Sequence, residues 1–357
     1  MRKLTPKYKR WLALRSRREL ARRQRRNRLA QVGGRNASPQ PRNRWLPPSR
    51  RRYVELALPA VLSLDRNFEE TIRVVQTIRW SLREGRPLRL DFTTLRDVSP
   101  AASLVLAAEL DRWRRLRQFR PRVIDIDHWD PTARRLLDEM GLFDLLEVQN
   151  PPFLLAAQGG TRFIRFRSQV GAVGDEAKQL RVAIEALTGR LPNTRVLYRA
   201  LSEAMSNVRL HAYPTGVAGR RATPVLKDRW WMAGSFDPAT RRLRVMFYDQ
   251  GLGIPRTLVR EHGIEQVRQI LSIFNLAPDD DAKMIKAALN LGRTRTGNPH
   301  QGKGLPDMLR VISQRPGASL RILSGAGEYI YITGQQEQLR ILEAPLGGTL
   351  IQWEMDL

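Results

Sequence analysis

The chain has 357 residues, of which 42% are hydrophobic, carries a formal net charge of +27 and contains no cysteine. This length allows two ordinary domains plus a tail, and the lack of cysteine excludes a disulfide framework, a zinc–thiolate site and a cysteine nucleophile. No apolar run approaches the ~18 residues of a membrane span, and no apolar core of a secretion signal follows the basic N-terminus. We therefore expect a soluble, cytoplasmic protein.

The excess positive charge is concentrated in residues 1–52, which hold 19 Lys and Arg and a single acid, Glu19. Repulsion within this segment predicts an arm that is disordered or forms a solvated helix, and the prolines between residues 39 and 48 are typical of a linker. The arm can be a solubilising tail, or it can bind the phosphates of a nucleic acid or an anionic membrane surface. Because guanidinium groups pair well with phosphate, we favour nucleic acid.

Residues 53–150 alternate between strand and helix patterns. Strands are predicted at 54–58, 88–92 and 123–126, and helices at 68–82, 101–116 and 132–140. Such alternation predicts an α/β layer in which helices cover one sheet. Ser99 is a suitable N-cap for the second helix, with Pro100 at its first position.

The segment from Leu90 to Ala102 resembles the strand, turn and helix start of a STAS domain, the fold of anti-sigma-factor antagonists. The resemblance implies a phosphate-accepting serine at the position of Pro100, which has no hydroxyl group. We therefore predict that residues 53–150 form a STAS-like domain that docks a protein partner. Regulatory phosphorylation at Ser99 or Ser103 is the alternative.

Beyond a boundary at Asn150-Pro151-Pro152, the pattern predicts a strand at 161–167, a helix at 175–187 and a long helix that opens at Pro192-Asn193. Glu203, Asn207 and His211 follow one side of this long helix, at the edge of an apolar stripe. Phosphoryl transfer needs a divalent ion and a group that orients or deprotonates the nucleophile. The carboxylate of Glu203 suits the second task and the amide oxygen of Asn207 suits Mg²⁺. The alternatives are an ordinary pair on a helix surface and, for His211, a structural histidine.

Three glycine-containing segments follow. A strand at 244–248 delivers Asp249 to its end, where Gly251 and Gly253 let the backbone pass close to a ligand; a simple hairpin turn is the alternative. Gly302-Lys303-Gly304 opens a helix whose N–H groups can face phosphates, without the spacing of a Walker loop. Gly347-Gly348-Thr349 enters the last strand.

Together these segments resemble the ATP site of the GHKL ATPases, the superfamily of gyrase-type topoisomerases, heat-shock chaperones, histidine kinases and anti-sigma-factor kinases. The resemblance covers residues 160–357 and implies a two-layer α/β sandwich that binds ATP and Mg²⁺. It implies a lid at 292–301 and the following residue roles: Glu203 as general base, Asn207 as metal residue, Asp249 as acceptor for the adenine amino group, and Gly251, Gly253, Gly302, Lys303, Gly304 and Thr349 as nucleotide contacts.

The function expected from these features is slow ATP hydrolysis, or phosphoryl transfer to a protein Ser or Thr in a partner-switching type of regulation, with the STAS-like domain fused in cis. The chain lacks the phosphoacceptor-histidine helix pair of sensor kinases, which disfavours that role. The alternative function is a non-catalytic, ATP-gated binding protein whose basic arm binds nucleic acid. The presence of Glu203 favours catalysis, because a pure binding protein does not need a base.

Overall fold

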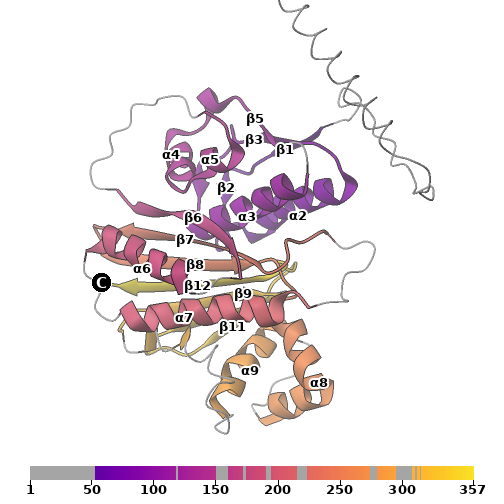
Figure 1. Cartoon of the computed structure of the whole chain (residues 1–357), viewed down its shortest axis with the longest axis vertical. Coiled ribbons are helices and arrows are strands. Elements are labelled where there is room, and N and C mark those ends of the chain that lie inside the picture. The colour runs from indigo at the N-terminus through magenta and orange to yellow at the C-terminus, as the bar shows by residue number, and fades with distance from the viewer. Residues whose placement is uncertain are drawn as a thin grey trace, which may run out of the picture. The chain divides into compact units, whose positions relative to one another are not determined.

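Two α/β lobes, joined by a shared hydrophobic core, make up the part of the chain that the structure describes (Figure 1). The structure is a computed structural model and describes residues 53–117, 120–149, 160–171, 174–189, 194–214, 223–273, 280–294, 308–309, 312–313 and 315–357. The predicted arm at 1–52, and the boundary at 150–152, lie outside these residues. We call residues 53–149 the N-terminal lobe and residues 160–357 the C-terminal lobe.

The N-terminal lobe contains a three-stranded parallel sheet of order β1-β3-β5, with β1 (Val54–Ala57), β3 (Leu88–Asp91) and β5 (Arg122–Ile124). Helices α2 (Phe68–Glu84) and α3 (Pro100–Leu116) connect the strands, and β2 (Val61–Leu62) pairs with β4 (Asp97–Val98). Helices α4 (Pro131–Glu139) and α5 (Leu142–Leu146) follow. The alternation predicted from the sequence is confirmed here. The predicted cap is also confirmed, because the Ser99 hydroxyl accepts a hydrogen bond from the Ala102 N–H and Pro100 begins α3.

Helix α3 is buried on every side between residues 101 and 113, including the charged residues Glu109, Asp111 and Arg112. It lies with α2 between the small sheet and the large sheet of the C-terminal lobe (Figure 1). Ser103 is only 2% exposed. The described structure therefore leaves little of α3 accessible to another protein, and its Ser103 hydroxyl is shielded from modification.

The C-terminal lobe is built on a seven-stranded sheet whose neighbouring strands are all antiparallel, in the order β11-β10-β9-β12-β8-β7-β6. Its strands are β6 (Arg162–Val170), β7 (Arg229–Asp237), β8 (Arg242–Asp249), β9 (Ser319–Ser324), β10 (Gly327–Ile332), β11 (Gln338–Ile341) and β12 (Thr349–Asp356). Its helices are α6 (Gly174–Thr188), α7 (Thr194–Asn207), the π-helix η3 (Val208–Ala212), α8 (Ile254–Ile273) and α9 (Asp281–Thr294).

The central strands of the large sheet are buried on both faces. On β7 and β8, Trp231 and Tyr248 pack into the core of the N-terminal lobe. Their neighbours Trp230 and Phe247 pack on the other side, with residues of α7 such as Leu201. Alternate side chains of a strand point to opposite faces, so the two clusters lie on opposite sides of the sheet. The two-layer sandwich expected for residues 160–357 thus gains a third layer from α2 and α3.

Two expectations need correction. His211 was expected on the same regular helix as Glu203, but α7 ends at Asn207 and the chain widens into η3, which changes the direction of the side chains that follow. The expected lid was placed at 292–301, but residues 292–294 are the last residues of α9; the remainder lies outside the described residues. In the C-terminal lobe, strands β7, β9, β10 and β11 and helices α8 and α9 were not predicted from the sequence. Helix α8 contains a non-helical residue, Gly263, that interrupts its periodicity.

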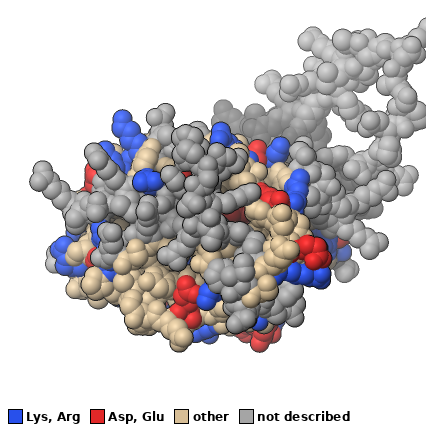
Figure 2. All heavy atoms as spheres, turned by 90° about the horizontal axis from the view of Figure 1, so that it is seen from below, with Lys and Arg blue, Asp and Glu red and all other residues tan. Residues whose placement is uncertain are grey.

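The described surface carries charges of both signs. In the view of Figure 2, Lys and Arg side chains alternate with Asp and Glu around the visible face, with uncharged surface between them. None of the helices in the described ranges combines the length and hydrophobicity that crossing a bilayer requires.

The shared core predicts that the two lobes unfold together. Trp231 is fully buried against α3, and its indole N–H donates to Asp111 at 3.0 Å. We expect Trp231→Ala to lower the free energy of unfolding by about 3–5 kcal/mol, measured by urea denaturation, and to shift one transition that is common to both lobes. Trp80→Ala is the matched control, because Trp80 is 37% exposed. Separate transitions, with the N-terminal lobe unaffected by the change at Trp231, would contradict the shared core.

Candidate functional site

Asp249 is the buried carboxyl at the centre of the site. It is the last residue of β8, is 6% exposed, and pairs across the sheet with Thr349, the first residue of β12. Its Oδ1 atom accepts a hydrogen bond from the Gly251 N–H at 2.7 Å, and the Thr349 N–H also donates to the carboxyl. Burial raises the pKa of Asp249 to about 7, although these two donors favour the ionised form.

Gly251 brings the segment after β8 into contact with the end of η3. The Leu252 N–H donates to the Ala212 carbonyl at 2.7 Å. A Cβ atom on Gly251 would lie 2.4 Å from the same carbonyl oxygen, so no other residue fits here without moving the backbone. One π-helical turn separates Asn207 from Ala212, and this contact therefore places the end of α7 beside the Asp249 loop.

Thr349 and Gly253 meet at Ser324, the last residue of β9. The Ser324 hydroxyl donates to the Gly348 carbonyl at 3.2 Å and accepts from the Ile254 N–H, which follows Gly253, at 2.8 Å. Its distance to the Thr349 hydroxyl oxygen is 3.0 Å. A hydroxyl has one proton and two lone pairs, so either Ser324 or Thr349 can be the donor in this pair.

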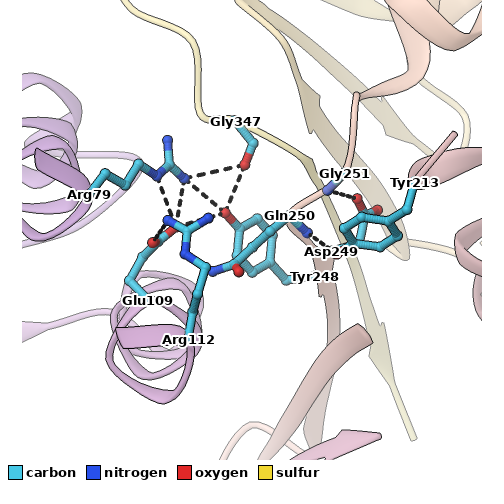
Figure 3. A network of polar contacts seen from close by, with 9 residues as sticks. All are labelled: Arg79, Glu109, Arg112, Tyr213, Tyr248, Asp249, Gln250, Gly251 and Gly347. Carbon is cyan, nitrogen blue, oxygen red and sulfur yellow. Dashed lines mark hydrogen bonds and ion pairs between the residues drawn. The ribbon is translucent and has the colours of Figure 1, made fainter. Parts of the chain in front are cut away.

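Tyr213 fixes the backbone immediately after Asp249. The Gln250 N–H donates to the Tyr213 hydroxyl at 2.9 Å, and that hydroxyl donates to the Arg229 carbonyl at 2.7 Å. Burial raises the pKa of Tyr213 well above its usual value, so the hydroxyl keeps its proton. Figure 3 shows Tyr213, Asp249 and Gly251 on one side of the strand end, and the ionic network of Glu109 on the other.

Glu203 and Asn207 are half-buried on α7, one turn apart, while Ala200 and Ala204 of the same helix and Val208 of η3 pack in the core. The side chain of His211 in η3 pairs through Nδ1 with Glu261 of α8. This contact fits the structural alternative for His211 and also ties η3 to the helix that follows the glycine segment.

The structure thus brings together four predicted residues, Asp249, Gly251, Gly253 and Thr349, with Asn207 nearby and Glu203 one turn farther along α7. Gly302, Lys303 and Gly304 lie outside the described residues. Sequence reasoning missed Ser324 and Tyr213. Ser324 had a local signal, since the alternating segment Ser319–Ser324 precedes Gly325-Ala326-Gly327 and reads as a strand that ends in a turn. Tyr213 had no such signal.

The polar groups of this site can form hydrogen bonds with a ligand. A carboxyl can accept hydrogen bonds from an amino group, and the neighbouring hydroxyl can accept or donate. Within the described ranges, no three His, Asp or Glu side chains cluster in a way that could hold a metal ion. A divalent ion at Asn207 would therefore need oxygens from phosphates and water, which is the usual situation for Mg²⁺.

The raised pKa of Asp249 predicts a specific pH dependence of stability. Between pH ~4 and ~7 the folded protein retains a proton that the unfolded chain releases, because an unperturbed Asp has a pKa of about 3.9. This contribution to stability is complete below pH ~4 and is lost as the pH rises through about 7. Asn at position 249 is neutral throughout. The free energy of unfolding of Asp249→Asn minus that of the wild type should therefore increase from pH 5 to pH 8 in urea titrations; parallel curves would contradict the assignment.

Comparison with protein-family models and with curated proteins finds no match to this chain.

Proposed function

We propose that this chain is an ATP-binding protein of GHKL type that hydrolyses ATP slowly or transfers its terminal phosphate to a Ser or Thr of a protein. The observation that carries the proposal is the pairing of buried Asp249 with Thr349 at adjacent strand ends, with Gly251 packed against Ala212 so that the backbone turns tightly beside them. The resemblance in the sequence led to these residues separately, and their proximity supports it.

In this proposal the Asp249 carboxyl accepts a hydrogen bond from the adenine amino group, with Thr349 beside it. The backbone at Gly251 and Gly253 passes close to the nucleotide, and Gly302, Lys303 and Gly304 contact the phosphates through N–H groups and a positive charge. Asn207 holds Mg²⁺, which neutralises charge on the phosphates during transfer. Glu203 orients or deprotonates the attacking hydroxyl. The acceptor is water or a protein hydroxyl, and the N-terminal lobe is where a protein partner would act.

Asp249→Asn tests the nucleotide site. The substitution keeps the shape of the side chain but replaces one acceptor with a donor, so we expect ATP affinity to fall by about 1–3 kcal/mol, measured by titration calorimetry above pH 8. Asp237→Asn is the matched control, because Asp237 ends the neighbouring strand β7 and its carboxylate accepts hydrogen bonds from local groups, the Ala239 N–H and the Thr240 hydroxyl. Equal ATP affinities of the wild type and Asp249→Asn would contradict the assignment of Asp249 as the adenine contact.

Glu203→Ala and Asn207→Ala separate chemistry from binding. If Glu203 acts on the nucleophile, its substitution should leave Mg-ATP binding intact and reduce product formation at least about 10²-fold, the usual range for a general base. Asn207→Ala should instead weaken binding only when Mg²⁺ is present. The measurements are ADP release and phosphoprotein formation from labelled ATP. A wild-type protein that binds ATP but forms neither product would favour the non-catalytic alternative.

A further inference from the structure

An arginine of the N-terminal lobe reaches the nucleotide site from the opposite side of the large sheet. Nη2 of Arg79, in α2, donates to the Tyr248 hydroxyl at 3.1 Å and to the Gly347 carbonyl at 3.3 Å. The Tyr248 hydroxyl donates to the same carbonyl at 2.8 Å (Figure 3). Tyr248 precedes Asp249, and Gly347 lies two residues before Thr349. Arg79 therefore contacts both strand ends that carry the predicted adenine contacts.

The fit between Arg79 and Gly347 is too close to tolerate a side chain at position 347. Gly347 has a φ of +76°, and a Cβ atom built there would lie 2.4 Å from Nη1 of Arg79. Gly347, in the glycine pair before Thr349, therefore has a structural role besides any nucleotide contact, because it leaves space for a guanidinium group from the other lobe. The next residue, Gly348, is held through its carbonyl by Ser324.

The position of Arg79 is fixed by a fully buried acid. Glu109 of α3 has no exposed surface and accepts from Nε and Nη2 of Arg79 at 3.0 and 2.7 Å. Arg112 pairs with the other oxygen of Glu109. Burial alone would lower the pKa of Arg79, but the charge of Glu109 and the Tyr248 contact outweigh it and raise the pKa. The guanidinium therefore stays charged, and a buried charge stays close to its partners because separation is costly.

We propose that Arg79 is a positioning residue, through which the N-terminal lobe sets the affinity and adenine preference of the nucleotide site. The inference rests on the proposed function of the Asp249 site. Arg79 touches no predicted nucleotide contact itself; it holds Tyr248 and Gly347, and these set where Asp249 and Thr349 lie. The N-terminal lobe is then an internal regulator of the site as well as a surface for a partner.

Arg321 supplies a matched control. It is a second buried arginine between the lobes: its Nη2 donates to the Leu64 carbonyl at 3.0 Å, and it pairs with Asp65 of the N-terminal lobe and with Glu328. Within the described residues, its polar partners are Leu64, Asp65 and Glu328, and neither Tyr248 nor Gly347 is among them. Losing either arginine removes a buried ion pair within one lobe, with Glu109 for Arg79 and with Glu328 for Arg321, and also contacts to the other lobe. Of the two, only Arg79 contacts the strand ends of the site, at Tyr248 and Gly347.

The experiment compares Arg79→Gln, Arg79→Lys and Arg321→Gln with the wild type. Affinities for ATP and GTP are measured by calorimetry, and melting temperatures are measured without nucleotide. We expect Arg79→Gln to weaken ATP binding about tenfold, the effect of losing a hydrogen bond from a charged donor, and to reduce the preference for ATP over GTP. Arg79→Lys keeps the charge opposite Glu109 but loses the planar fork, so its affinity should be intermediate. Arg321→Gln should lower the melting temperature yet retain the preference.

A second readout does not depend on nucleotide. The amide N–H groups of Gly251 and Thr349 donate to Asp249, and their hydrogen exchange should accelerate in both Arg79 variants but not in Arg321→Gln. If the wild-type protein binds no adenine nucleotide, the proposed function is contradicted. Hydrogen exchange at these amides then still tests whether Arg79 positions the Asp249 site. If the wild type binds ATP, but the Arg79 variants keep the wild-type preference for ATP over GTP and the wild-type hydrogen exchange at Gly251 and Thr349, only the positioning role of Arg79 is overturned. If Arg79→Gln does not fold, Arg79→Lys decides between these outcomes.

Discussion

A carboxylate without exposed surface, Glu109, is the constraint on which the arrangement of the two lobes depends. An ionised acid removed from water is stable only when it is paired and hydrogen-bonded, and removing one partner of such a pair typically costs about 3–5 kcal/mol. Its partners Arg79 and Arg112 come from α2 and α3. Nη2 of Arg79, which donates to Glu109, also donates to the Tyr248 hydroxyl and to the Gly347 carbonyl of the C-terminal lobe. One buried charge thereby fixes two helices and two strand ends with respect to each other.

The location of the candidate site follows from the same packing. Because the N-terminal lobe packs on one face of the central strands β7 and β8, and residues of α6 and α7 pack on the other, these strands offer no open face to a ligand within the described residues. A ligand can instead bind at the loops that join the strand ends. Functional residues are commonly found on loops that a rigid scaffold holds in place. Asp249, Ser324 and Thr349 occupy such ends of β8, β9 and β12. Their mutual hydrogen bonds hold them in place before any ligand is bound.

The sequence predicted the residues whose signal is local and missed those whose role depends on distant partners. Asp249 could be identified because neighbouring residues indicate both a strand end and a tight turn: a glycine follows two residues later and another follows four residues later. The partnership of Arg79 with Gly347 joins positions 268 residues apart, and no periodicity or spacing encodes it. Strand β7 was missed because it is buried on both faces, so Trp230 and Trp231 give no alternation. The direction of His211 was missed because the π-helix at the end of α7 has no signature in composition.

The turn before α3 indicates how the N-terminal lobe can transmit a signal. In the STAS resemblance, control is exerted by phosphate on a serine at that turn, but here the position is Pro100, the Ser99 hydroxyl accepts a hydrogen bond as the helix cap, and Ser103 is buried. Modification of this turn is therefore poorly suited to regulation, and α3 already packs against β7 and β8. Helix α2 differs, because Arg79 faces the sheet while the next residue, Trp80, is partly exposed and lies near Arg86. A partner that acts on this lobe would reach the Asp249 site, where we propose that ATP binds, most directly by shifting α2, since that helix carries the arginine that contacts Gly347.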